Sequence, residues 1–185
     1  MATPLYYAAL LGLESVLNSI LPIEARDSEI SEIVNAQGGR LGNALQAAAD
    51  GGHEKVVQML LDRGADVNAQ GRRFSNALQG RWFGNTLQAA SFGGHEKVVQ
   101  MLLDRGANVN AQGGRFSNAL QAAAYRGHEK VVRMLLDRGA DVNALVGLYG
   151  NAVQAAADGG HENVVQMLLG REAGIHADGS VTTSI

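Results

Sequence analysis

Four histidines recur at regular positions, and their chemistry is the first to consider. Each stands in a Gly-His-Glu triplet, and 33 residues separate the second from the third and the third from the fourth. A zinc ion holds imidazole nitrogens within about 2.0–2.1 Å. Packed helices lie about 8–10 Å apart, so one histidine per structural unit cannot converge on a single ion. We therefore predict no metal site and expect each ring to pack and hydrogen-bond at a helix start. The four are His53, His95, His128 and His161.

Other catalytic or cofactor-binding constellations are not evident. The chain has no cysteine, which leaves no thiol nucleophile and no thiolate site. Asp62, Asp104 and Asp137 each occupy the same place in successive copies of one segment. A catalytic pair needs different groups meeting in one pocket. Although there are 24 glycines, none lies in a phosphate-binding GxxxxGK[ST] loop. We predict that the protein is not an enzyme and binds no cofactor.

The amino-acid composition further limits the class of protein. The 185 residues are enough for one elongated domain, 46% are hydrophobic, and the formal net charge is −3. Lysine and arginine form no cluster, which argues against direct nucleic-acid binding. No apolar run approaches the roughly 18–20 residues of a membrane span, and the first ten residues lack the pattern of a secretory signal. We expect an intracellular protein, cytoplasmic or nuclear.

These histidines belong to a longer repeated segment. The sequence GGHEKVVQMLLDRGADVNAQ, which begins at Gly51, recurs with few changes along the chain. A period near 33 residues is typical of stacked repeats, in which each unit buries its apolar face only against its neighbours. Because a stacked array has an extended surface, the sequence favours a binding role.

The sequence of each copy predicts two helices. In the copy from 118 to 145, Asn118 and Gln121 have the spacing of a capping box. A run of alanines follows, and Gly127 ends this short helix. His128 opens a second helix that Gly139 ends. The second helix places its apolar residues at helical spacing on one face; these are Val131, Val132, Leu135 and Leu136.

The pattern G-H-x-x-V-V-x-x-L-L-x-x-G-A-D-V-N-A resembles the ankyrin repeat. It is present in the copies from Gly52, Gly94 and Gly127, and in a fourth copy from Gly160 that decays after Leu169. Residues 3–9 resemble the Thr-Pro-Leu-His opening of that family, and the later Asn-Ala-Leu-Gln openings are similar to arrays of filamentous fungal proteins. The resemblance implies an all-α, ankyrin-type α-solenoid of about five helix-turn-helix repeats with finger turns. The expected array spans 1–177, with repeats at about 1–37, 38–70, 80–112, 113–145 and 146–177, and a tail at 178–185.

Two insertions interrupt the period. The first repeat is seven residues too long, and Asp27 is placed to cap a short extra helical turn there. Nine extra residues separate the second and third repeats, where the segment 74–79 returns as 83–88. Only the second copy is followed by Ala89 and Ala90, so we expect the helix to begin after Asn85. We expect 71–79 to be an inserted finger.

The resemblance implies that the fingers and the ends of the first helices form a concave surface that binds proteins. Carried over by position, the expected partner-binding residues are Arg40, Asp50, Arg81, Trp82, Phe92, Arg115, Tyr125, Arg126 and Asp158. Tryptophan, tyrosine and arginine are enriched at interface hot spots, and the two aspartates would form a rim. The competing interpretation is that Phe92 and Trp82 merely cover the inserted finger.

Two further interpretations stay open. The last helix is as apolar as an internal one, although a solenoid needs a polar outer face at its ends. Either the tail folds back, or the array associates with itself through this uncapped end, or the chain is part of a longer array. The protein is then a self-assembling structural or regulatory repeat protein. A further alternative is a nuclear transcriptional co-regulator that acts through a protein partner.

Overall fold

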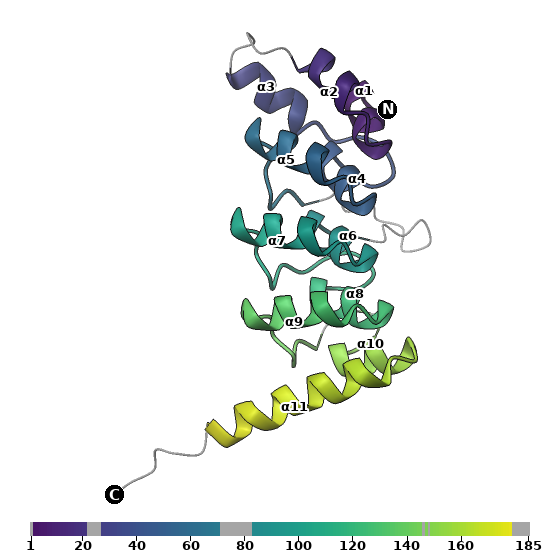
Figure 1. Ribbon diagram of the computed structural model, residues 1–185, viewed down its shortest axis with the longest axis vertical. Coiled ribbons are helices and arrows are strands. Elements are labelled where there is room, and N and C mark those ends of the chain that lie inside the picture. Colours follow the sequence, from purple (N-terminus) through teal and green to yellow (C-terminus); the bar gives the residue numbers. More distant parts are fainter. Residues whose placement is uncertain (1, 22–26, 71–82, 146, 148, 179–185) are drawn as a thin grey trace, which may run out of the picture.

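The fold is an elongated stack of helix pairs (Figure 1). In this computed structural model, the described residues are 2–21, 27–70, 83–145, 147 and 149–178. Within them lie eleven helices and two isolated β-bridges, and no strand. The prediction of an all-α helix-turn-helix solenoid is therefore confirmed. The predicted inserted finger at 71–79, with Arg81 and Trp82 beside it, lies outside the described residues.

The helices form two rows. The inner row consists of α1 (Pro4–Leu10), α4 (Ala44–Asp50), α6 (Thr86–Gly93), α8 (Ala119–Arg126) and α10 (Ala152–Asp158). The outer row consists of α2 (Glu14–Ile20), α5 (Glu54–Asp62), α7 (Glu96–Asp104), α9 (Glu129–Asp137) and α11 (Glu162–Asp178). Helix α3 (Asp27–Val34) is additional. Each inner helix contacts the next inner helix and its own outer partner.

Asparagine caps set the start of the inner helices. The side chain of Asn118 accepts a hydrogen bond from the backbone N–H of Gln121 at 2.8 Å, and Asn85 does the same for Gln88 at 2.9 Å. Helix α6 thus begins after Asn85, as expected from the second copy of the duplicated segment. Gly127 ends α8 in the left-handed region with φ 71°, a conformation that glycine adopts without strain.

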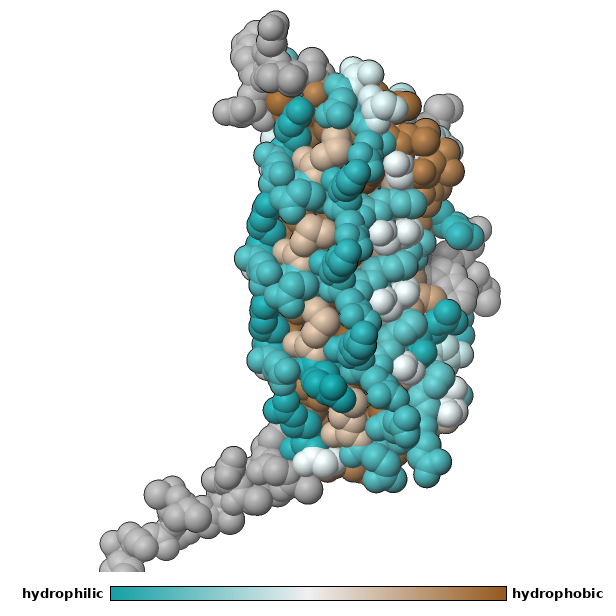
Figure 2. Space-filling view, viewed as in Figure 1, coloured by the Kyte–Doolittle hydropathy of each residue, from teal (hydrophilic) through white to brown (hydrophobic). Residues whose placement is uncertain are grey.

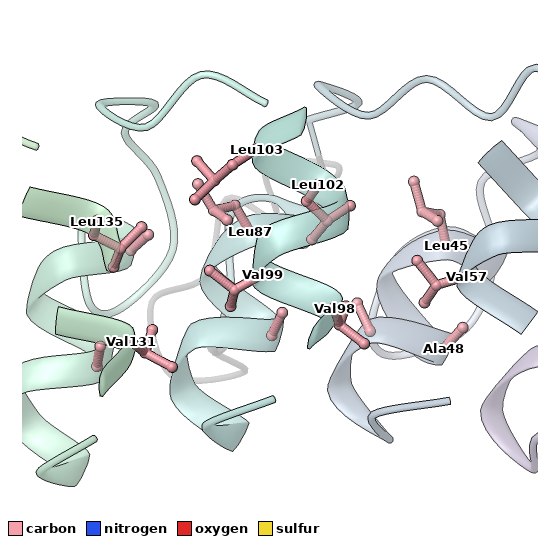
Figure 3. Packing of buried hydrophobic residues seen from close by; sticks show 14 of the residues in the cluster. Leu45, Ala48, Val57, Leu87, Val98, Val99, Leu102, Leu103, Val131 and Leu135 are labelled. Carbon is pink, nitrogen blue, oxygen red and sulfur yellow. The ribbon is translucent and has the colours of Figure 1, made fainter. Parts of the chain in front are cut away.

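Small residues in the inner row let the helices approach closely. Ala123 and its equivalents are fully buried, and the valines and leucines of the outer helices fill the space beside them (Figure 3). The Leu135 side chain is completely buried between α9 and the inner row. This arrangement makes one continuous core that runs the length of the array.

Each histidine joins its repeat to the preceding one. His53 Nε2 lies 3.0 Å from the carbonyl oxygen of Leu10, and His128 Nε2 lies 2.9 Å from that of Phe92. The ring packs on a glycine of the preceding repeat, since a Cβ on Gly94 would lie 2.6 Å from the His128 ring. The predicted packing and hydrogen bonding of the histidines are confirmed for His53, His95 and His128, with the added finding that the contact links two repeats.

The capping glutamines also link repeats, which the sequence pattern did not reveal. In α4 the complete Asn43–Gln46 capping box is present. The same Gln46 side chain donates from Nε2 to the carbonyl oxygen of Ala69 at 3.2 Å. Gln121 likewise donates to Ala144 at 3.2 Å, and also to the carbonyl oxygen of Gly150 in the fifth repeat at 3.1 Å. The buried glutamine therefore holds the inner helix and also fixes the loop that leads to the next repeat.

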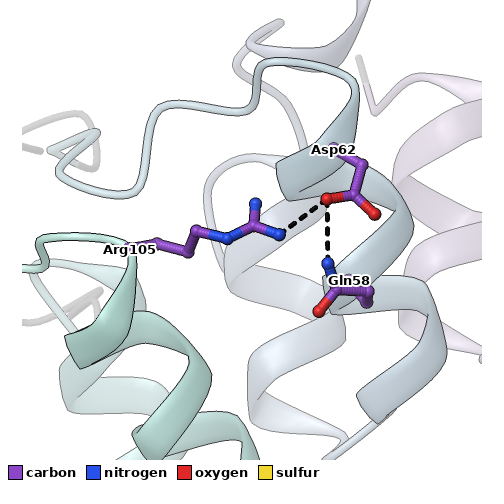
Figure 4. Close-up of polar contacts among 3 residues, drawn as sticks. All are labelled: Gln58, Asp62 and Arg105. Atoms are coloured by element: carbon purple, nitrogen blue, oxygen red, sulfur yellow. Dashed lines mark hydrogen bonds and ion pairs between the residues drawn. The ribbon is translucent and has the colours of Figure 1, made fainter.

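Ion pairs connect the outer helices along the exposed side. Asp62 accepts hydrogen bonds from Gln58 at 2.8 Å and from Arg105 of the next repeat at 2.6 Å (Figure 4). These two bonds hold the pKa of the Asp62 carboxyl below its usual value. Arg138 pairs with Asp104 at 2.7 Å in the same way. The recurring aspartates are thus part of a ladder between repeats.

The two ends of the array differ from its interior. Helix α3, eight residues long, stands where only a short helical turn was expected, and its Ile30 and Val34 join the core. At the N-terminal end Leu11 is 63% exposed, and an apolar area covers this part of the surface (Figure 2). At the other end α11 has 17 residues, against nine in α9. Leu169, equivalent to the buried Leu136, is 43% exposed.

Replacing Leu135 with alanine is expected to lower the free energy of unfolding by about 2–5 kcal/mol, because it opens a cavity between repeats. The matched control is Leu169→Ala, where the side chain is half-exposed and the loss should stay below about 1 kcal/mol. Urea unfolding followed by circular dichroism measures both. Equal losses would contradict the packing described here.

Stability should also depend on His128. Burial lowers the pKa of this ring from its ordinary value of 6.5. As the pH falls, the unfolded chain therefore takes up the proton first, so the stabilising effect is complete above about pH 6.5 and declines below it. His128→Gln keeps a donor for the Phe92 carbonyl but does not titrate. Melting temperatures between about pH 7.5 and 5.5 should fall more steeply for the wild type than for this variant, and parallel curves would refute the assignment.

Candidate functional site

Five aromatic rings gather on the inner row of the array. They come from two positions in the repeat. Three stand two residues before the capping asparagine of an inner helix, and two stand in the last turn of an inner helix. We call these five the aromatic cluster; its members are Phe83, Phe92, Phe116, Tyr125 and Tyr149.

Phe116 lies at the centre of the aromatic cluster. Its ring centroid is 4.9 Å from that of Phe92 and 5.3 Å from that of Tyr125. Tyr149 stacks on Phe116 with centroids 5.6 Å apart and an interplanar angle of 8°. Because the rings come from three successive repeats, this packing ties the repeats together on the finger side.

Exposure divides the aromatic cluster into a base and a surface. Phe83 and Phe116 are buried, at 5% and 0% exposed. Phe92, Tyr125 and Tyr149 are only partly buried, although they contact the same core. The buried rings therefore hold the three outer rings in place, and these present apolar and phenolic edges to the surface.

Two arginines border the exposed rings. The guanidinium carbon of Arg126 lies 4.8 Å from the centroid of the Phe92 ring, within the range of a cation–π contact. Nη2 of Arg115 donates to the Tyr149 hydroxyl at 3.5 Å. Both arginines are exposed. The site thus combines aromatic faces with two guanidinium groups, one over the Phe92 ring and the other beside the Tyr149 hydroxyl.

Acidic residues occupy the flanking repeats. Asp50 ends α4 at the position of Phe92 and Tyr125, and Asp158 ends α10 at the same position. Partial burial raises the pKa of the Asp50 carboxyl, while His95 and the exposed Arg40 oppose this effect. Positive charge and aromatic surface are consequently concentrated in the two middle repeats.

The structure brings together four of the residues that the sequence singled out. Phe92, Arg115, Tyr125 and Arg126 lie in or beside the aromatic cluster. Arg40 and Asp50 lie together in the second repeat, and Asp158 lies in the last. Arg81 and Trp82 fall outside the described residues, so their predicted role stays a prediction.

Sequence reasoning missed Phe83, Phe116 and Tyr149. The signal was available, because these residues and Leu41 stand at one position, two residues before the capping asparagine. A large apolar side chain there in four copies indicates a packing site. Its contact with the helix-end position of the same and the preceding repeat depends on the finger's path, which spacing alone does not reveal.

The histidines and carboxylates of the described residues do not gather at one point. No three His, Asp or Glu side chains there lie close enough to hold a metal ion. The histidine rings instead contact backbone carbonyls of the preceding repeat. No described helix combines the length and the apolar character that a membrane span requires.

Comparison with known proteins gives consistent matches. Residues 86–179 match a family model described as ankyrin repeats in three copies, and residues 43–72 match one described as ankyrin repeat. The chain is also similar to "Azaphilone pigments biosynthesis cluster protein L" of Monascus ruber, with 63% identity over 67 residues. The matched stretch is 36% of this chain and only 14% of the length of that protein.

The aromatic cluster and its arginines should differ in their effect on stability. Phe116→Ala is expected to lower the free energy of unfolding by about 3–5 kcal/mol, because the ring is completely buried. Arg126→Ala removes only an exposed cation–π contact, worth about 0.5–1 kcal/mol. Thermal unfolding of the two variants measures the difference. A loss at Arg126 as large as that at Phe116 would make Arg126 a structural residue.

Proposed function

Because this chain belongs to the ankyrin repeat family, whose members generally serve as protein-interaction modules, we propose that it is a non-enzymatic module that binds a protein partner. The binding surface consists of the fingers and the ends of the inner helices. The observation that supports this most is the group of partly exposed rings beside two exposed arginines in the middle of the array.

Differences between the repeats support the choice of surface. The residues that join one repeat to the next are nearly identical, and α5 and α7 have the same sequence, EKVVQMLLD. At the ends of the inner helices, in contrast, the chain has Asp50, Phe92, Tyr125 and Asp158. Packing does not dictate the residue there. Large aromatic and arginine side chains at the centre of a surface are typical of interface hot spots.

The properties of the outer row also support the choice of the inner-row surface as the binding surface. Several of its charged residues form pairs between repeats, such as Lys97 with Glu54 at 3.2 Å and Lys130 with Glu96 at 3.4 Å. A regular surface of paired charges offers little that is specific to one partner. We place the module in the cytoplasm or nucleus; the absence of cysteine is consistent with a reducing compartment.

Self-association is the second candidate, favoured by the exposed apolar side chains at both ends. Leu11 is 63% exposed at the N-terminal end, and Leu169 is 43% exposed at the other. A copy would not stack on the N-terminal end as interior repeats do, because Tyr7 stands where α4 and α6 have the buried Ala47 and Ala89. Assembly would therefore join other surfaces than those that join successive repeats.

Affinity capture from source-cell extract tests the proposal. The bait variant Arg115→Ala/Arg126→Ala should lose a partner that the wild type retains, by at least about tenfold in mass-spectrometric intensity, because interface energy is concentrated in few residues. The matched control is Lys97→Ala/Lys130→Ala, which removes two positive charges from the outer row. It should retain the partner.

Two other outcomes would count against this surface. Equal capture by all three baits would move the binding site to another part of the array. Recovery of bait alone, together with a light-scattering mass that grows with concentration, would favour self-association.

A further inference from the structure

We propose that the partner presents an extended acidic segment, in which carboxylates pair with Arg115 and Arg126 and an apolar side chain packs on Tyr125 and Tyr149. The inference rests on the proposed function, since it specifies the chemistry of whatever binds the inner-row surface.

The state of Arg126 is the first argument. Among the described residues it forms no ion pair, and its guanidinium lies over the Phe92 ring. The guanidinium carbon lies 4.8 Å from the ring centroid, and this contact does not use the fork of N–H groups as an ion pair would. That fork matches the two oxygens of a carboxylate. Because the aromatic contact already limits the side chain's freedom, less conformational entropy is lost when a carboxylate binds.

The position of Arg115 is the second argument. It lies on the finger of the fourth repeat, near the Tyr149 hydroxyl of the fifth, whereas Arg126 leans back toward Phe92 of the third. The two guanidinium groups therefore border the exposed rings on different sides. Tyr125 and Tyr149, with centroids 4.9 Å apart, lie between them as an apolar platform. A ligand that contacts the whole site therefore needs two negatively charged groups with an apolar group between them.

The flanking charges set the length of the acidic segment. Asp50 and Asp158 stand at the equivalent helix ends on either side of Phe92 and Tyr125. Asp158 would repel an anion that extended over the last repeat, whereas beside Asp50 the exposed Arg40 offsets part of the repulsion. A segment with two or three carboxylates fits the region between them, whereas a long polyanion such as nucleic acid meets repulsion at the last repeat.

Comparison with the outer row also indicates that the ligand of the inner row is negatively charged. There several basic residues pair with acidic ones, as Arg105 does with Asp62 and Arg138 with Asp104. An acidic ligand would have to displace those carboxylates. Although the chain carries a formal net charge of −3, the middle of the inner row attracts a negatively charged segment.

Selection from a displayed library of random peptides tests the inference. The full chain is immobilised, and enrichment is compared for the wild type, Arg115→Ala/Arg126→Ala and Lys97→Ala/Lys130→Ala. We expect selected peptides to contain at least two Asp or Glu residues around an apolar one. Their affinity should fall about tenfold or more with the arginine variant, stay unchanged with the lysine control, and weaken between ~50 and ~500 mM salt.

A photo-crosslinking group on the selected peptides separates the two ways of failing. Crosslinks to the fingers and ends of α6 and α8, made by peptides that lack acidic residues or do not need the arginines, would overturn this inference and leave the proposed surface intact. Crosslinks to α5, α7 or α9, or no enrichment with any bait, would overturn both. Preference for phosphorylated over Asp- or Glu-containing peptides would also overturn the inference, because phosphate would then replace carboxylate.

Discussion

The structure depends on the close contact between each histidine and a glycine of the preceding repeat. The ring of His128 leaves no room for a side chain at Gly94, and its Nε2 bonds to the carbonyl at the end of the preceding inner helix. Distance and orientation between neighbouring repeats are fixed at one point near the turn between the two rows. The glutamine bonds to the following loop and the Asp–Arg pairs of the outer row can then form at the same place in successive repeats.

Because these contacts use only part of each repeat, the remaining positions are free to differ. The aromatic cluster occupies such positions, and its buried base and exposed surface have separate roles. Phe116 supports the packing of three repeats, whereas Tyr125, Arg126 and Arg115 are the residues that we propose a ligand contacts. A rigid support of this kind reduces the entropy lost on binding. The scaffold therefore does not determine the partner. The few residues that vary between repeats define the chemistry of the binding surface.

Much of this fold could be predicted from the sequence, since helix starts, helix ends and the apolar face follow from local spacing. Asn85, Gly127 and Leu135 behave as the pattern indicated. Contacts between repeats were harder to predict, because a repeat period shows that the units stack but not which atoms are in contact. The bond from His128 to Phe92, the bond from Gln121 to Gly150 and the burial of Phe116 all depend on the relative placement of two repeats. For the candidate site, the structure places Phe92, Arg115 and Arg126 near Tyr125, and their role in binding stays a prediction, whereas the supporting rings were not predicted.

The sequence identity of α5 and α7 has a consequence for how the chain reaches this structure. Either helix can pack equally well against the apolar face intended for the other, so nothing in the outer row tells a folding chain which neighbour is correct. A transient misalignment by one repeat would keep the core contacts and most hydrogen bonds, and would resemble a domain swap in its energetics. Only positions that differ between repeats can reject it. The second repeat has Leu41 and Asp50 where the third has Phe83 and Phe92, so residues of the aromatic cluster also help to keep the repeats in sequence.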